Sequence, residues 1–282
     1  MPWARLKGVK LYYEISGLEE NPAIVFQGHG HKTWTWQVID FSSYYRVITF
    51  DRRGTGFSSA PKGPWTIEDF AEDMRQLLEY LKVERAIIVG SSLGGDIGLE
   101  FCLDHPENAI ALVMNGTLHY LNDFHRQWID ELIAGKRELS NFGARDFDWQ
   151  KEGPLQGDPE FAKTDLGIFL RKIYARNEFT EPNKQANKEQ LRAARKIDFR
   201  PRYKEMEKMG KRIPTLITCG SRETMFMMTS SYEMHLHLTN SELIVIPDYY
   251  HASLREKPEI FNADVYRFLE KHGLFNPKRR LD

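Results

Sequence analysis

The chain has 282 residues, of which 41% are hydrophobic and 12% aromatic, so it can bury a full core as one large domain, with or without an insertion. Its 39 Lys and Arg residues balance 40 Asp and Glu residues, which excludes an overall charge that would attract nucleic acid or an anionic membrane. The sequence contains no apolar run long enough to span a membrane and no signal peptide pattern, so we expect a cytoplasmic protein.

Short apolar runs rich in β-branched residues alternate with helical patterns, which is typical of a mostly parallel sheet with helices on both faces. Lys10–Ile15 alternates its pattern and is predicted to be an antiparallel edge strand. The central strands are predicted at Ala23–Phe26, Tyr45–Phe50, Ala86–Val89, Ile110–Met114, Thr215–Cys219 and Leu243–Ile246. The predicted fold class is therefore α/β.

Three helices are well marked in the sequence. The first begins at Thr66, where Thr66 and Asp69 have the spacing of a capping box. The second follows Ser92 and stops before Pro106. The third begins at Pro258, a favoured first-turn residue. Its buried residues are predicted to be Ile260, Phe261, Val265, Phe268 and Leu269.

Strand patterns are missing from the middle of the chain. Between residues 117 and 209 the sequence shows helical patterns separated by proline-containing breakers. We therefore predict a discontinuous core, formed by residues 1–116 and 210–282, with residues 117–209 inserted as a helical cap.

The motif Gly90-Ser91-Ser92-Leu93-Gly94 carries the strongest chemical signal. It follows an apolar strand pattern and precedes a helical one, as a G-x-S-x-G nucleophile elbow requires. The sharp turn would hold Ser92 above the sheet with its hydroxyl exposed. An ordinary Gly/Ser loop is the alternative, but the strand and helix on either side favour the elbow.

A serine nucleophile needs a base, and the base needs an orienting acid. His251 follows the last strand and precedes the final helix, so it is the best placed of nine histidines. Glu223, just after the strand that ends at Cys219, is the first candidate for the acid. Asp248 is the alternative, although its spacing of three residues from His251 suits a structural turn.

Two backbone amides are predicted to stabilise the oxyanion that forms during acyl transfer. These are the N–H of Leu93, directly after the nucleophile, and the N–H of His29 in the turn after the first central strand. His29 and His31 could instead suggest a metal, but no third ligand stands near them, so we expect none. Cys102 and Cys219 lie in apolar patterns, which favours buried, reduced thiols.

These residues together resemble the α/β-hydrolase superfamily. The turn Asp51–Ser58 (DRRGTGFS) is similar to its D-x-R-G-x-G-x-S motif, and His251 with the segment Glu256–Asn262 is similar to its histidine loop and closing helix. Gln27 stands where the family usually carries His, and Glu223 where it usually carries Asp.

The resemblance implies a serine hydrolase that cleaves an ester, a lactone or a related carbonyl through Ser92, His251 and Glu223, of class EC 3.1. It implies no cofactor, a small-molecule substrate, and a monomer or homodimer. The pattern looks nearest to esterases, enol-lactone hydrolases and aminoacrylate hydrolases. The alternatives are a ligand-binding receptor with little turnover, and a lyase, cyclase or acyltransferase of the same fold.

Overall fold

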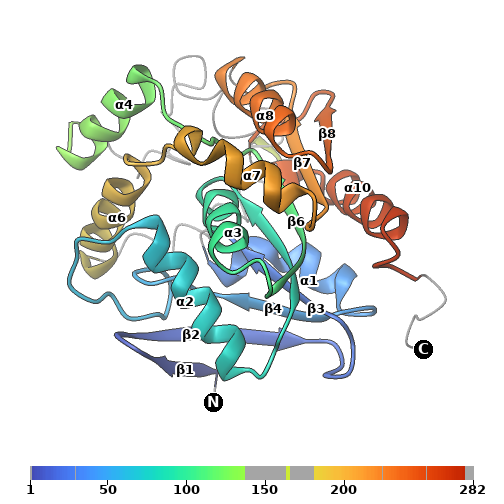
Figure 1. The fold of residues 1–282 in the computed structure, drawn as a ribbon. Coiled ribbons are helices and arrows are strands. Elements are labelled where there is room, and N and C mark those ends of the chain that lie inside the picture. The colour runs from blue at the N-terminus through green and yellow to red at the C-terminus, as the bar shows by residue number, and fades with distance from the viewer. Residues whose placement is uncertain are drawn as a thin grey trace.

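The computed structural model describes residues 2–28, 30–136, 163–165, 181–223, 225–251 and 253–276. Its centre is an 8-stranded sheet in the order β1-β2-β4-β3-β5-β6-β7-β8 (Figure 1). The strands are β1 Trp3–Leu6, β2 Val9–Ser16, β3 Ala23–Gln27, β4 Arg46–Phe50, β5 Ala86–Ser91, β6 Ala109–Asn115, β7 Thr215–Gly220 and β8 Ser241–Ile246. The pairs β1–β2 and β2–β4 are antiparallel, and the others are parallel.

All six predicted central strands are confirmed, but the prediction for the edge of the sheet is wrong. The predicted strand over Lys10–Ile15 is β2, and it is covered by β1, which is the true edge. The register pairs Leu6 with Val9, so a two-residue turn with Gly8 at φ 83° joins the two strands. This Lys-Gly turn was the available signal for a hairpin.

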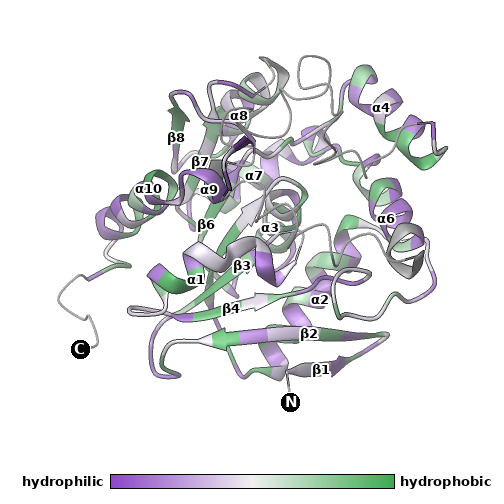
Figure 2. Cartoon of the chain, turned by 180° about the vertical axis from the view of Figure 1, so that it is seen from behind, coloured by the Kyte–Doolittle hydropathy of each residue, from purple (hydrophilic) through white to green (hydrophobic). Residues whose placement is uncertain are grey.

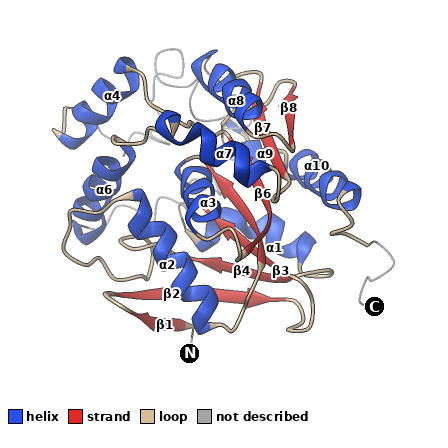
Figure 3. Cartoon of the chain, viewed as in Figure 1, coloured by secondary structure: helices blue, strands red, loops and turns tan. Residues whose placement is uncertain are grey.

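Helices cover both faces of the sheet (Figure 3). The helices are η1 His31–Trp34, α1 Thr35–Phe41, α2 Ile67–Tyr80, α3 Leu93–Asp104, α4 Asp123–Ile133, α6 Glu181–Ala194, η5 Arg200–Arg202, α7 Tyr203–Gly210, α8 Met225–His237, α9 Ser253–Glu256 and α10 Pro258–Lys271. None of the helices in the described ranges is long and apolar enough to cross a membrane.

Strand side chains alternate between two separate apolar cores, one on each face of the sheet. On β3, Ile24 and Phe26 join the core with α1 and α10, whereas Val25 joins the core with α2, α3, α7 and α8. Figure 2 shows hydrophobic residues along the central strands and a mixture of hydrophobic and hydrophilic residues on α6 and α10. Burial on both faces explains why the central strands are continuously apolar in sequence.

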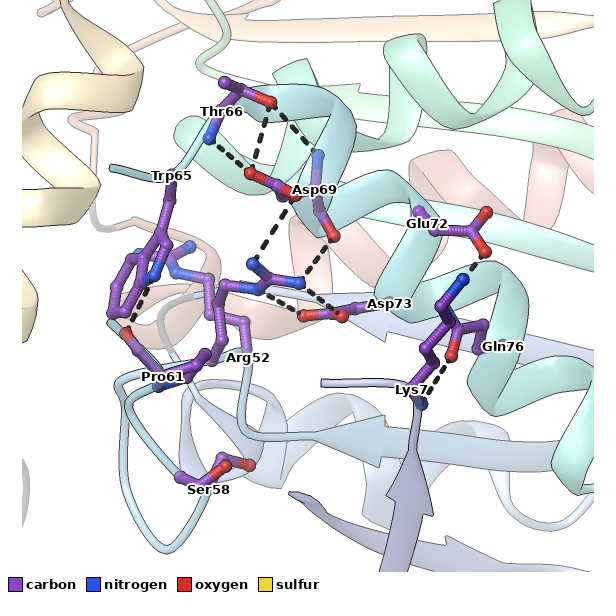
Figure 4. A network of polar contacts seen from close by, with 12 residues as sticks. Lys7, Arg52, Ser58, Pro61, Trp65, Thr66, Asp69, Glu72, Asp73 and Gln76 are labelled. Atoms are coloured by element: carbon purple, nitrogen blue, oxygen red, sulfur yellow. Dashed lines mark hydrogen bonds and ion pairs between the residues drawn. The ribbon is translucent and has the colours of Figure 1, made fainter. Parts of the chain in front are cut away.

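The three helices expected from sequence are confirmed. Thr66 and Asp69 form the capping box of α2, each side chain accepting a hydrogen bond from the other residue's backbone N–H (Figure 4). The helix α3 ends at Asp104, and α10 begins at Pro258. The prediction was wrong for Ile260, which is 37% exposed because it lies on the outer face of α10.

Within the predicted cap, α4 and α6 lie side by side at one side of the molecule (Figure 1). Arg195, just after α6, donates to the Asp130 carboxylate on α4 at 2.8 Å. The helix α6 also contacts the core, since a Cβ atom placed on Gly54 would lie 2.8 Å from Ala186 Cβ. The cap boundaries stay a prediction.

The turn Asp51–Ser58 is anchored to α2 by a bidentate ion pair, in which Arg53 Nε and Nη2 each donate to the Asp73 carboxylate at 2.7 Å. The Asp73 side chain is 1% exposed. Asp73→Asn removes the buried counter-charge of a largely buried guanidinium and leaves it the Asp69 carboxylate, which is 3.6 Å away and 41% exposed. We therefore expect the free energy of unfolding to fall by about 3 kcal/mol. Urea denaturation measures this change.

Glu72→Gln is the matched control, because Glu72 pairs with Arg75 on the same helix but is 41% exposed. We expect this exposed pair to contribute less than about 1 kcal/mol. Equal losses in the two variants would contradict an anchoring role for Asp73.

Candidate active site

Ser92 occupies a strained turn between β5 and α3, with φ 54° and ψ −131°. The glycines around it allow this turn to form. A Cβ atom on Gly90 would lie 2.2 Å from the Gly94 carbonyl oxygen, and one on Gly94 would lie 2.1 Å from the Gln27 carbonyl oxygen. The predicted elbow therefore has the expected geometry, with Ser92 at the N-terminus of a helix.

The segment after β6 holds the elbow from one side. Ser92 N donates to the Asn115 carbonyl oxygen at 2.9 Å, and the Thr117 hydroxyl donates to the Ser92 carbonyl oxygen at 3.5 Å. Because β6 is the parallel neighbour of β5, this segment leaves the sheet beside the nucleophile.

The structure brings Glu223 and His251 together. Glu223 Oε1 lies 3.4 Å from His251 Nδ1, and the two side chains are 1% and 19% exposed. Main-chain bonds from Ser221 N to the Ile246 oxygen and from Arg222 N to the Tyr249 oxygen, at 2.9 and 3.0 Å, hold the two loops together. A distance of 3.4 Å is longer than a strong hydrogen bond, but catalytic hydrogen bonds often tighten only when substrate binds.

Gly116 connects this pair to the nucleophile's side of the site. It follows Asn115, which binds Ser92 N, and a Cβ atom on it would lie 2.8 Å from both Glu223 Oε1 and His251 Nδ1. The three predicted residues therefore gather at the carboxyl ends of β5, β7 and β8, where ligands bind in open parallel sheets.

The alternative acid, Asp248, points elsewhere. Its carboxylate is 2.7 Å from Arg222 Nη2 and 70% exposed, and its backbone has φ 51°. The short spacing to His251 therefore belongs to a structural turn, and the geometry favours Glu223 as the acid.

Of the two predicted oxyanion donors, Leu93 is the first residue of α3, where helix N–H groups have no partner within the helix. His29 lies outside the described residues. Of its neighbours, Gly28 accepts a hydrogen bond from Arg52 Nη1 at 2.9 Å, and His31 N donates to Asp51 Oδ1 at 2.9 Å.

Sequence reasoning did not identify Arg52 or Gly116 as part of this site. Gln27, at the position where the family usually has His, is fully buried, and its amide has no partner in the part of the chain that the structure describes. The imidazole of His31 binds Asp51 at 2.7 Å through Nδ1. Cys102 and Cys219 are buried, free thiols, and burial raises the pKa of Cys219 to about 11.

Gly116→Ala tests the contact between the two sides of the site. The new methyl group would displace the Glu223–His251 pair, so we expect kcat for a p-nitrophenyl ester to fall about 100-fold. Gly135→Ala is the matched control, because Gly135 also has positive φ, at 70°, but nothing lies within 4 Å of its Cβ position. Both variants pay the same backbone strain, so similar activities would contradict the role of Gly116.

Comparison with known proteins shows the family to which the chain belongs. The alpha/beta hydrolase fold family matches residues 26–258, which is most of the chain. The chain therefore belongs to the α/β hydrolase family and is a hydrolase of that fold.

Several relatives are distant in sequence but match over nearly the whole chain. The 3-oxoadipate enol-lactonase 2 of Acinetobacter baylyi is 23% identical over 93% of this chain and 94% of that protein. A Caulobacter protein assigned as the carbamate hydrolase RutD is 25% identical over 92% of this chain and 95% of that protein. The solved enol-lactonase of Burkholderia xenovorans has a TM-score of 0.80 at 24% identity, covering 95% of this chain and 100% of that one.

Proposed function

We propose that the protein is a serine hydrolase of esters, lactones or related carbonyl compounds. The observation that carries the proposal is that the strained Ser92 turn and the Glu223–His251 pair both border the Asn115–Gly116 segment, the first through Ser92 N and the second beside Gly116. A relative named as an enol-lactonase and another assigned as a carbamate hydrolase support carbonyl substrates of this kind.

Acylation begins when Ser92 Oγ attacks the carbonyl carbon and its proton passes to His251 Nε2, the ring nitrogen that faces away from Glu223. Glu223 stabilises the resulting imidazolium, and the N–H groups of Leu93 and the loop after β3 bind the oxyanion. His251 then protonates the departing alkoxide, which leaves an acyl ester on Ser92.

Deacylation repeats these steps with water. His251 takes a proton from a water molecule while the water oxygen attacks the acyl carbon. The proton then passes from His251 to Ser92 Oγ as the carboxylic acid leaves. In a lactone the leaving alkoxide stays attached to the acyl chain, so the product is a single hydroxy acid. This cycle needs no cofactor.

The proposal is tested on the wild-type protein with a fluorophosphonate probe and with p-nitrophenyl acetate, a γ-lactone and an aryl carbamate. We expect the probe to modify Ser92, as located by peptide mass spectrometry, and at least one substrate to be hydrolysed. A folded protein that is neither labelled nor active would contradict the proposal and favour a ligand-binding role.

A further inference from the structure

Arg52 lies between the cap and the nucleophile region. It is the second residue of the turn Asp51–Ser58 and is 4% exposed, which is unusual for an arginine. Its Nη1 donates to the Gly28 carbonyl oxygen at 2.9 Å, and its Nε donates to Gln190 Oε1 on α6 at 2.7 Å. One guanidinium thus binds the loop after β3 and the predicted cap at the same time.

The bond to Gly28 acts on the loop that is predicted to donate to the oxyanion. Gly28 packs on the first turn of α3, since a Cβ atom on Gly94 would lie 3.2 Å from Gly28 Cα. A trans peptide is planar, with its C=O and N–H directed to opposite sides. A donor that fixes the Gly28 carbonyl therefore also fixes the direction in which that peptide unit can donate.

The bond to Gln190 links the guanidinium to the cap. Gln190 is 4% exposed, and its Nε2 has no partner in the described ranges, so its amide is placed by contacts that include the bond to Arg52. The same helix contacts the Asp51–Ser58 turn through Ala186 against Gly54. The fork of an arginine is rigid, so an acceptor at Nε sets the direction of Nη1.

We propose that Arg52 is a positioning residue that couples the docking of α6 to the geometry of the oxyanion loop. The inference rests on the proposed serine hydrolase function. Arg52 acts through Gly28 and does not touch the substrate. When α6 is displaced, the guanidinium loses its orientation, the Gly28 peptide is released, and the transition state loses stabilisation while substrate binding is retained.

The experiment removes the acceptor on α6 and measures kcat and KM for p-nitrophenyl acetate, a substrate too small to depend on contacts with the cap. In Gln190→Leu we expect kcat to fall about 10-fold to 100-fold with KM within about 2-fold of wild type. The rate of fluorophosphonate labelling should fall in parallel, because its phosphoryl oxygen binds the same donors. Gln190→Glu keeps the acceptor and should restore kcat to within about 3-fold of wild type.

Gln185→Leu is the matched control, because Gln185 lies on the same helix but is exposed, and we expect its kcat to equal that of wild type. Arg52→Met should lower kcat at least as much as Gln190→Leu, and the double variant should be no worse than Arg52→Met. If Arg52→Met does not fold, the difference in kcat between Gln190→Leu and Gln190→Glu tests the inference.

Two results would overturn the inference while the proposed function stands. One is that the wild type is active and Gln190→Leu has the same kcat. The other is a Gln190→Leu variant that raises KM with kcat unchanged, which would indicate a substrate contact. A wild type that reacts with neither probe nor ester would contradict the proposed function itself and this inference with it.

Discussion

Ser92→Ala should lower kcat/KM for ester hydrolysis by at least about 10⁴-fold, because the variant lacks the hydroxyl that forms the acyl intermediate in the proposed mechanism. Labelling by a fluorophosphonate should disappear. Alanine keeps the backbone strain at φ 54° and removes one partly buried hydroxyl, so the free energy of unfolding should change by less than about 1 kcal/mol. Initial rates, mass spectrometry and urea denaturation measure the three quantities.

The neighbouring Ser91 gives a matched control. Its Oγ accepts a hydrogen bond from Asn115 Nδ2 at 3.2 Å, at the end of β5. We expect Ser91→Ala to keep hydrolysis within about 3-fold of wild type, since it loses one partly buried hydrogen bond. Full activity in Ser92→Ala, or inactivity confined to Ser91→Ala, would show that the nucleophile is assigned to the wrong serine.

Local rules explain why much of the fold could be predicted from sequence. The central strands are apolar on both sides because each packs against two cores, and α2 has its cap and its apolar stripe in sequence. The strand β1 was missed because its four residues, three of them apolar, are too few to show an alternating pattern. The burial of Ile260 was predicted wrongly because not every apolar residue of a helix faces the protein core.

The candidate site, like the fold, has a part that could be predicted from sequence and a part that needed the structure. Ser92, Glu223 and His251 each follow a strand, and parallel strands end at one edge of the sheet, so sequence order predicted that all three lie at that edge. The choice between Glu223 and Asp248 needed the structure, because only the turn at Asp248 shows its carboxylate directed to Arg222.

Arg52 could not be recognised from sequence. Its partners are 24 and 138 residues away, and the motif around it is explained by Arg53 and the turn alone. Gly116 was similarly hidden, because its role is the space that it leaves for Glu223 and His251. Contacts of this kind arise from tertiary packing, and a single sequence carries no direct signal for them.

Glu223→Gln should lower kcat about 10³-fold with little change in KM. The amide cannot neutralise the imidazolium, and replacement of the acid in a serine protease triad costs about 10⁴ in kcat. Glu223→Asp keeps the charge but is one methylene shorter, so the distance of 3.4 Å to His251 should lengthen and the loss should be intermediate. Asp248→Asn is the control, and its exposed pair with Arg222 should leave kcat within about 2-fold of wild type.

Stability separates a catalytic role of Glu223 from a structural one. Both of its carboxylate oxygens are buried without a hydrogen-bond partner in the described ranges, so the charge is costly to the folded state. Glu223→Gln should therefore raise the free energy of unfolding by about 1 kcal/mol while activity falls. If Glu223→Gln lost both stability and activity, Glu223 would be a structural carboxylate. If Glu223→Gln were active and Asp248→Asn inactive, Asp248 would be the acid.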